Sequence, residues 1–360
     1  MSESDSAATK TARVTDGPSV PGINDPYLRE QLEHRRKKLQ SAISTVTATE
    51  TDSRMAPLFE LLGEVDSALQ RMDQGTYGIC DVCHDTVEKE RLIADPLVRL
   101  CLDHLSSEEQ RALERDLELA SRVQRGLLPA PNLYHDDWRI HYRYKPAGLV
   151  SGDYCDLILP SADRKSFLFL IGDVAGKGVA ASLLMTHLHA MFRTLSGLGL
   201  DLRRLLDVAN RVFCESTIAG QYATLVCGRA EHDGKIELAS AGHFPALHIS
   251  KDSVKQIVAT GLPLGMFANS SYTIERVHLK PGDTLLLYTD GILEAADPSG
   301  REYGIDALSR IASAGENCSP QELVAACLMD VERHSAGTKQ ADDQTLMAIH
   351  RSRAAAYSAA

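Results

Sequence analysis

The chain of 360 residues is long enough for two domains, one of which could hold a core of about 200 residues. Its formal net charge of −11 argues against a general binder of nucleic acid or of anionic membranes, because both partners favour basic surfaces. No apolar run approaches the length of a membrane span, and residues 1–16 lack the apolar segment of a secretory signal. We therefore expect a cytoplasmic protein with no membrane partner and no direct nucleic-acid partner.

We expect residues 1–26 to be a disordered tail, because they are polar and show no hydrophobic period. Two helices are predicted next, at about 27–44 and 55–72, with a polar tip between them. Two such helices form an antiparallel hairpin, which we place with the cysteine motifs in one module, residues 27–105.

Three of the eight cysteines cluster, at Cys80, Cys83 and Cys101, and the other five are isolated. This distribution indicates a reducing compartment with one metal site, not a disulfide framework. Cys80 and Cys83 form a C-x-x-C knuckle, and Cys101 and His104 repeat its spacing. Three thiolates and one imidazole nitrogen complete a tetrahedral shell for one Zn²⁺. His84 is the rival fourth ligand, but it would leave the second knuckle with a single ligand.

The finger resembles that of the DksA/TraR family. The resemblance rests on Gly-Thr-Tyr-Gly-Ile-Cys-Asp-Val-Cys (75–83), Arg-Leu-Ile-Ala-Asp-Pro (91–96) and Arg-Leu-Cys (99–101). It implies a zinc-stabilised helical module. The chain departs from the family at His104, where a cysteine is usual. It also departs at the hairpin tip, where Asp52 is present but Met55 replaces a second acid. We therefore do not carry over insertion into RNA polymerase.

A connector helix is predicted over about 106–128, in a linking segment at 106–130 that ends near Pro129. Apolar residues and one glutamine repeat at heptad-like spacing: Leu113, Leu117, Ala120, Gln124 and Leu127. Two interpretations stay open. The helix docks on the following domain, or it forms a homodimer and carries a signal from the zinc module.

Short apolar strands dominate from Trp138 onward and predict an α+β domain over 131–352, with a short tail at 353–360. Four amphipathic helices are predicted at about 179–196, 201–215, 303–314 and 319–334. The strands are predicted at about 138–145, 153–159, 166–172, 221–229, 235–241, 245–250, 254–259, 273–279, 284–289 and 344–350.

Acidic residues recur at the ends of these strands: Asp153, Asp173, Asp290, Asp342 and Asp343. Taken singly, each could be a turn aspartate that caps its own backbone. Together they repel one another, and divalent cations relieve that repulsion. Their hard oxygen donors favour Mg²⁺ or Mn²⁺ over zinc. The glycine-containing loop 172–178 is not read as a nucleotide site, because its spacing and final residue differ from a phosphate-binding loop.

Six colinear motifs resemble the SpoIIE/RsbU group of PP2C-type (PPM) serine phosphatases. They are Ser-Gly-Asp-Tyr-Cys-Asp (151–156), Gly-Asp-Val-Ala-Gly-Lys-Gly-Val-Ala-Ala (172–181), Ala-Gly-His-Phe-Pro-Ala (241–246), Gly-Leu-Pro-Leu-Gly (261–265), Tyr-Thr-Asp-Gly-Ile-Leu-Glu-Ala (288–295) and Asp-Asp-Gln-Thr (342–345). The departures are mild: Ser151 for a usual glycine, Cys155 for a usual aromatic residue, and Lys177 for a frequent histidine.

This resemblance implies a β-sandwich flanked by helices (αββα) with two Mn²⁺ or Mg²⁺ ions between the sheets. Asp173 would bridge both ions, the Val174 carbonyl would ligate one, and Asp153 would help to hold the same side. Asp290 and one of the Asp342/Asp343 pair would complete the other site. The family pattern favours Asp342 as the direct ligand, with Asp343 supporting it.

The resemblance further implies a metal-dependent phosphoserine/phosphothreonine phosphatase that uses activated water, with Asp153, Asp173 and Asp290 as its catalytic acids. Its implied substrate is a phosphorylated STAS-type anti-sigma-factor antagonist of a bacterial stress-signalling pathway, and the zinc module would regulate it. His243 is either a general acid or a structural residue, and its turn context favours the second. The alternative function is a non-enzymatic regulator whose zinc hairpin binds RNA polymerase or another protein.

Overall fold

The computed structural model describes residues 23, 25–45, 56–105, 107–159, 166–218, 220–251, 253–258, 261–315 and 318–352. The chain divides into two compact units, Met1–Glu114 and Arg115–Ala360. The boundary falls inside helix α4 (Ser107–Leu127), at the position of the predicted connector. Within the described ranges, no helix is both long enough and apolar enough to cross a membrane.

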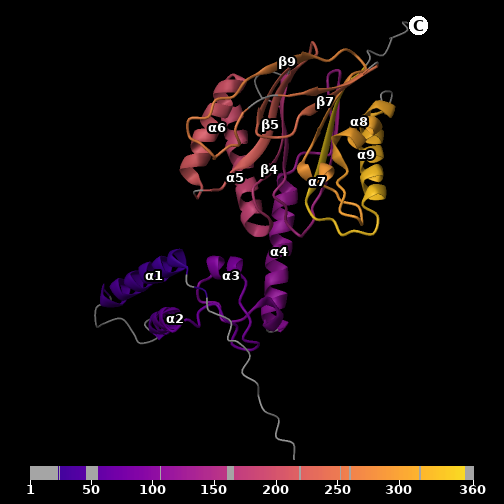
Figure 1. Cartoon of the computed structure of the whole chain (residues 1–360). Helices are drawn as coiled ribbons and strands as arrows, with labels where there is room; N and C mark the ends of the chain where they lie inside the picture. The colour runs from indigo at the N-terminus through magenta and orange to yellow at the C-terminus, as the bar shows by residue number, and fades with distance from the viewer. Residues whose placement is uncertain are drawn as a thin grey trace, which may run out of the picture. The chain divides into compact units, whose positions relative to one another are not determined.

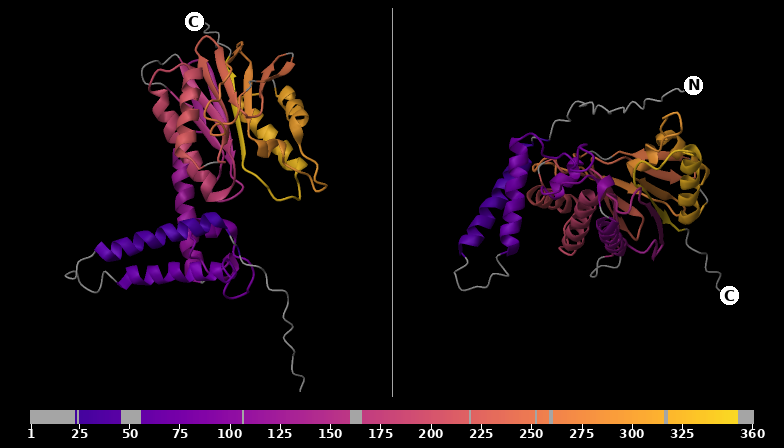
Figure 2. Two further views of the ribbon diagram at one scale, coloured as in Figure 1. Left: turned by 60° about the vertical axis from the view of Figure 1, so that its left-hand side comes forward. Right: turned by 90° about the horizontal axis from the view of Figure 1, so that it is seen from below.

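The first unit is built on a helical hairpin. Helices α1 (Pro26–Thr45) and α2 (Ala56–Asp73) lie side by side (Figure 2). Their apolar faces share one core with the cysteine-containing segment, which adds Tyr77 and Leu92. This segment contains a short helix α3 (Lys89–Ala94) and a 3₁₀ turn η1 (Leu102–His104). Asp52 and Met55 at the predicted tip lie outside the described residues, as do both predicted tails apart from a few residues before α1.

The second unit is a sandwich of two antiparallel sheets (Figure 1). The six-stranded sheet has the order β1 (Asn132–His135), β2 (Trp138–Lys145), β11 (Gln344–Arg351), β10 (Thr284–Tyr288), β7 (Ala246–Ser250) and β8 (Ser253–Ile257). The five-stranded sheet has the order β3 (Tyr154–Ile158), β4 (Ser166–Val174), β5 (Ala223–Glu231), β6 (Lys235–Ala241) and β9 (Glu275–His278).

Helices cover the outer face of each sheet and give the four layers αββα. Helices α5 (Gly178–Ser196) and α6 (Leu202–Ser216) cover the five-stranded sheet. Helices α8 (Gly304–Ala314) and α9 (Pro320–His334) cover the six-stranded sheet. This is the predicted arrangement.

The run Phe167–Ile171 of strand β4 is apolar at every position because both faces of the strand are covered. Phe167 and Phe169 point into the core between the two sheets, whereas Leu168 and Leu170 belong to the core under α5 and α6. Successive side chains of a strand point to opposite faces, so a strand covered on both sides must be apolar on both.

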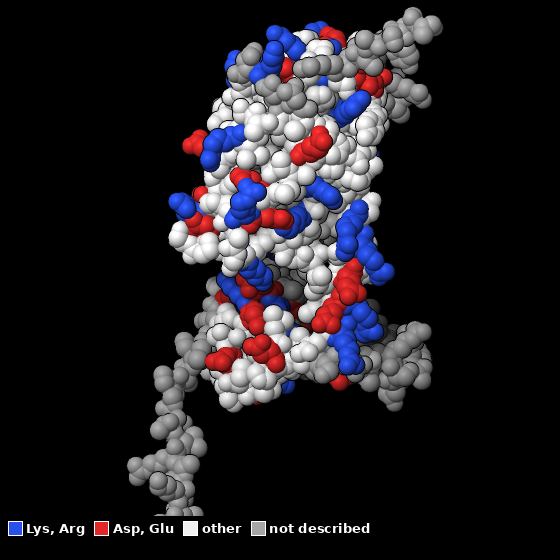
Figure 3. Space-filling view, turned by 90° about the vertical axis from the view of Figure 1, so that its right-hand side faces the viewer, with Lys and Arg blue, Asp and Glu red and all other residues white. Residues whose placement is uncertain are grey.

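The sequence missed four short elements: α3, η1, β1 and α7 (Asp290–Leu293). Strand β1 is a partly exposed edge strand of four residues, and α7 is a single turn, so neither produces a hydrophobic period. The start of α9 is as predicted: Ser319 and Glu322 form a reciprocal capping box, and Pro320 follows the cap. On the face shown in Figure 3, the described acidic and basic side chains are interspersed.

Candidate metal centres

Strand β4 carries two of the predicted ligands, Asp173 and Val174, to its end. The chain then turns through Gly176 and Gly178, whose φ angles are 102° and 72°. Side chains other than glycine rarely adopt such angles, which explains the two glycines before α5. The sharp turn leaves the Val174 carbonyl and the Asp173 carboxylate at the edge of the sheet.

Asp153 is buried between the two sheets, with 1% of its surface exposed. Its Oδ2 atom accepts hydrogen bonds from Thr289 Oγ1 (3.0 Å) and from Thr345 Oγ1. Its Oδ1 atom is buried and has no hydrogen-bond partner. Such an atom costs free energy unless a cation or water satisfies it. The sequence did not single out either threonine, although Thr289 directly precedes Asp290 and Thr345 stands two residues after Asp343.

The two neighbouring acids Asp342 and Asp343 differ in their contacts. Asp343 accepts backbone hydrogen bonds from Ala147 N (2.7 Å) and Gly152 N (2.9 Å), one on each carboxylate oxygen. Asp342 Oδ2 instead pairs with Lys177 Nζ at 2.8 Å. Asp343 therefore holds the turn before β3, whereas Oδ2 of Asp342 pairs with the exposed side chain of Lys177.

Asp290 begins α7, and Gly291 N donates to its Oδ1 at 2.8 Å. A Cβ atom on Gly291 would lie 2.0 Å from the Asp343 carbonyl oxygen. No side chain fits there without a shift of the backbone. The glycine therefore allows the turns that carry Asp290 and Asp342 to approach each other closely.

Burial and mutual repulsion disfavour the ionised forms of these acids. Burial, followed by the charges of Asp290, Asp342 and Asp343, raises the pKa of Asp173 to about 8. Burial and then Asp342 raise the pKa of Asp290. Burial also raises the pKa of Asp153 well above its ordinary value, despite the hydrogen bond from Thr345. The cluster thus holds more negative charge than its surroundings compensate.

The donor set fits a site for divalent cations. A Cβ atom added at Gly152 would lie 3.1 Å from Asp173 Oδ1 and 3.2 Å from the Val174 carbonyl oxygen, so both donors line the same small space. All the donors are hard oxygens, as Mg²⁺ and Mn²⁺ prefer. No three of these aspartates bring carboxylate oxygens within 4.8 Å of one another, so they do not form one closed shell. This spacing suits ions that each keep several waters and few carboxylates.

His243 joins the two sheets through both of its ring nitrogens. Its Nε2 lies 3.0 Å from the Tyr288 carbonyl, which can only accept, so Nε2 carries the proton. Its Nδ1 then accepts from Thr224 Oγ1 at 2.8 Å. Burial lowers the pKa of His243 to about 4. The ring is neutral near pH 7 and fully bonded, which favours the structural interpretation over a general acid.

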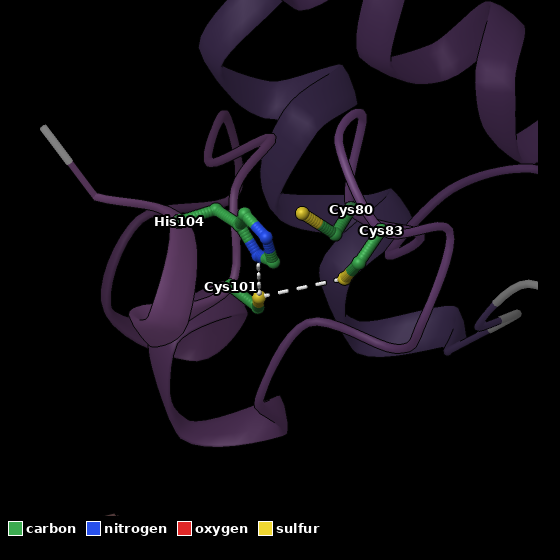
Figure 4. Close-up of side chains that lie close together, drawn as sticks. All are labelled: Cys80, Cys83, Cys101 and His104. Carbon is green, nitrogen blue, oxygen red and sulfur yellow. Dashed lines mark hydrogen bonds between the residues drawn. The ribbon is translucent and has the colours of Figure 1, made fainter.

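The four predicted zinc ligands lie together in the first unit (Figure 4). One ligand atom from each of Cys80, Cys83, Cys101 and His104 lies within 4.8 Å of all the others. Cys101 Sγ is 3.7 Å from Cys83 Sγ and 3.1 Å from His104 Nδ1. Among the described residues, this is the one cluster of three or more His, Cys, Asp or Glu side chains with this spacing.

Local turns place the two knuckles. Cys80 N donates to Asp85 O at 2.8 Å, and His84, with a φ of 61°, turns the chain between them. His104 N donates to Cys101 O at 3.1 Å and closes the second turn. His84 is exposed and lies outside the cluster, so the geometry favours His104 as the fourth ligand.

The end of α4 is docked within the second unit by polar contacts. Gln124 is 4% exposed, and its Nε2 donates to Ser151 O at 2.6 Å. Its Oε1 accepts from Ser151 N at 3.0 Å. Gln124, which occupies a predicted heptad position, therefore makes an intramolecular contact and not a contact with a second chain. At this end, the helix docks on the domain that follows it, as the first of the two interpretations predicts.

Comparisons with known proteins agree with both parts of the chain. Residues 163–352 match the family model described as Stage II sporulation protein E (SpoIIE). Residues 75–103 match the prokaryotic dksA/traR C4-type zinc finger.

The chain is 26% identical over 265 residues to Protein IcfG of Synechocystis sp., covering 66% of this chain and 41% of IcfG. It is 29% identical over 194 residues to phosphoserine phosphatase RsbU of Bacillus subtilis, covering 53% of this chain and 57% of RsbU. It thus spans about half the length of these curated relatives.

The SiaA-PP2C domain of Pseudomonas aeruginosa has the same fold, with a TM-score of 0.60 and 18% identity over 68% of this chain and 99% of that one. The family match covers more than half of the chain. The chain therefore belongs to the SpoIIE family and carries a dksA/traR-type zinc finger ahead of its PP2C fold.

Proposed function

We propose that the chain is a PP2C-type protein serine/threonine phosphatase that depends on Mg²⁺ or Mn²⁺. The observation that carries this proposal is the buried Asp153 carboxylate, whose Oδ1 atom has no hydrogen-bond partner, beside Asp173, whose pKa is raised to about 8. Strongly perturbed carboxylates in one cluster are typical of functional sites. Membership of the SpoIIE family and the similarity to a protein named phosphoserine phosphatase support the same activity.

Four aspartates and one backbone carbonyl would hold two cations. They are Asp153, Asp173, Asp290, Asp342 and the Val174 carbonyl. When bound, such ions supply an activated water and positive charge for the phosphoryl oxygens.

The surrounding residues hold these donors in place. Thr289 and Thr345 bind one oxygen of Asp153 and leave the other available, and Asp343 holds the turn at Gly152. Cys155, beside Asp153 and Asp156, is a poor nucleophile near neutral pH, because burial raises the pKa of its thiol well above its ordinary value.

The proposed substrate is phosphoserine on a STAS-type anti-sigma-factor antagonist of a bacterial signalling pathway. The support for this choice is the similarity to RsbU and RsbP, both named phosphoserine phosphatases. The alternative function is a non-enzymatic regulator whose zinc hairpin binds RNA polymerase or another protein. The missing second acid at the hairpin tip, where Met55 stands, weakens it.

In the first unit, Cys80, Cys83, Cys101 and His104 are proposed to bind one Zn²⁺, which would stabilise the finger and make it a regulatory input. The support is the four-ligand cluster, because closed Cys/His shells are typical of structural zinc. A homodimer through α4 would have to use a face other than the one that contains Gln124. Leu119 and Val123 lie on such a face and are 52% and 55% exposed.

The activity is tested by release of phosphate from an aryl phosphate in the presence of Mn²⁺ or Mg²⁺. We expect metal-dependent turnover that Asp173→Ala abolishes. Asp233→Ala is the matched control, since Asp233 pairs with Lys235 in a surface turn. Full activity of Asp173→Ala, or no activity with either metal, would refute the proposal.

A further inference from the structure

We propose that Gln124 is a positioning residue that links helix α4 to the acidic site through the loop Ser151–Asp153. The proposal rests on the proposed function and names how that site is regulated. Displacement of α4 would break a contact that holds the loop, and the affinity of the site for its cations would fall.

Both ends of the Gln124 carboxamide are used by a single residue. The amide group donates to the Ser151 carbonyl and accepts from the Ser151 N–H, at 2.6 and 3.0 Å. Gln124 and Ser151 are 4% and 0% exposed, so water does not compete for these bonds while the helix is docked. A shift of α4 therefore breaks two buried hydrogen bonds at once and leaves a donor and an acceptor unpaired on each side.

The two Gln124–Ser151 hydrogen bonds, which we call the clamp, reach Asp153 through one further bond, because Ser151 Oγ accepts from Asp153 N at 3.1 Å. Separately, Tyr144 OH of β2 donates to the Asp153 carbonyl at 3.2 Å. Gly152, between Ser151 and Asp153, donates to Asp343. Each of the three loop residues is thus fixed by a different element. Among the described hydrogen bonds to this loop, the bonds of Gln124 are the ones that come from α4.

An open pocket borders this end of α4. It has a volume of about 430 Å³ and is lined among others by Ser121 and Arg125. Leu128, which follows the helix, packs against both cores of the sandwich unit. Beside this apolar contact, the two Gln124–Ser151 hydrogen bonds and the bond from Tyr142 OH to the Pro129 carbonyl (2.5 Å) fix the helix end.

A change in the loop would alter the affinity of the site for cations through Asp153. Its Oδ2 is fixed by Thr289 and Thr345, but the direction of its unpartnered Oδ1 depends on the backbone of the loop. A residue that orients a ligand from outside the site typically changes metal affinity by about 10- to 100-fold when it is removed. Gln124 acts one residue further away, through Ser151, whose hydroxyl group accepts from Asp153 N, and it stands on the helix that joins this unit to the zinc module.

The test uses the full-length protein with Gln124→Leu, which removes both bonds. Gln124→Glu is a second variant of nearly the same volume, which keeps the acceptor and places a carboxylate against the Ser151 carbonyl. Ser121→Ala is the matched control, since Ser121 is buried on the same helix and bonds to Arg125, not to the loop. Mn²⁺ affinity is measured by calorimetry, and hydrogen exchange is followed across the loop in metal-free protein.

We expect both Gln124 variants to bind Mn²⁺ at least about tenfold more weakly and to exchange the loop amides faster. Ser121→Ala should match the wild type in both measurements. Turnover at saturating Mn²⁺ should change far less than the Mn²⁺ concentration needed for half-maximal rate. Unchanged Mn²⁺ affinity and loop exchange in either folded Gln124 variant overturns the proposal. Neither readout requires turnover, so a wild type that binds Mn²⁺ without phosphatase activity would refute the proposed function alone.

Discussion

The two oxygens of Asp153 have different surroundings, and this asymmetry defines the proposed site at the scale of single residues. Hydroxyl groups of Thr289 and Thr345 bind Oδ2, while Oδ1 has no partner. The two hydroxyl groups hold the side chain in one orientation and leave its other oxygen available for another ligand. We expect the loss of either hydroxyl group to weaken cation binding.

We expect Thr345→Val to weaken Mn²⁺ binding by about 10- to 100-fold, because the isosteric change removes one donor to Asp153. Thr284→Val is the control, since Thr284 is also buried in a paired strand but bonds to His350. Calorimetric titration of both variants with Mn²⁺ makes the comparison. Equal affinities would show that the threonine does not support the site.

His243 gives a prediction on pH. Its folded pKa of about 4 lies below the ordinary value of 6.5, so folding favours the neutral ring. Its contribution to stability is complete above pH 6.5 and is lost as the pH falls from there toward 4. We expect the free energy of unfolding to drop by roughly 2–4 kcal/mol more over this range in the wild type than in His243→Gln.

The measurement is urea denaturation of metal-free protein, followed by the fluorescence of the single tryptophan, Trp138, which is buried in the sandwich core. His187→Gln is the control, because His187 bonds to the hydroxyl group of Ser216 outside the space between the sheets. If the pH dependence of His243→Gln equals that of the wild type, the histidine is not held neutral by the fold.

The identity of the fourth zinc ligand is also decided by single residues. We expect about one zinc per chain, lost or much weakened in His104→Ala and retained in His84→Ala, because His84 lies outside the cluster. Elemental analysis after dialysis in reducing buffer measures the stoichiometry. Retention of zinc by His104→Ala together with its loss from His84→Ala would reverse the assignment.

At the scale of elements, α4 combines two tasks in one helix. Its first part belongs to the unit with the cysteine cluster and its later part to the sandwich unit. The later part is attached by Gln124 and by the turn after the helix, where Pro129 accepts from Tyr142. The effect of the first unit and the effect of the Gln124 contact can therefore be tested independently.

Two shortened chains distinguish these two effects. A chain that begins at Arg115 keeps Gln124, and we expect its Mn²⁺ affinity to match that of the full chain, with any change in rate or oligomeric state due to the missing first unit. A chain that begins at residue 130 also lacks the clamp and should bind Mn²⁺ more weakly. Calorimetry, assays of rate and light scattering compare them. Identical rate and oligomeric state in the full chain and in the chain that begins at Arg115 would argue against control by the zinc module.

At the scale of the whole molecule, local patterns predicted the elements and motifs well. The apolar run before Asp173 is a strand buried on both faces, and the Ser319–Glu322 capping box begins α9. The αββα order followed from the family resemblance. The short β1 and α7 left no periodic signal.

The contacts that the sequence could not predict join residues far apart in the chain. Gln124 and Ser151 are 27 positions apart, and Asp153 and Thr345 are 192 apart. The local pattern around each residue gives no sign of its distant partner. Gln124 occupies a heptad position of a helix, and Thr345 lies in a strand. These side chains reach the site only because the fold brings the two sheets and the end of α4 together.

The central claim is that this acidic cluster hydrolyses phosphoserine with the help of divalent cations. The most direct measurement is phosphate release from a phosphoserine-containing STAS-type protein of the same genome, by metal-free enzyme to which Mn²⁺ or Mg²⁺ is added back. We predict that release requires the added metal and that Asp173→Asn, which keeps the size of the side chain, abolishes it. Release at an equal rate without metal, or by Asp173→Asn, would contradict the claim.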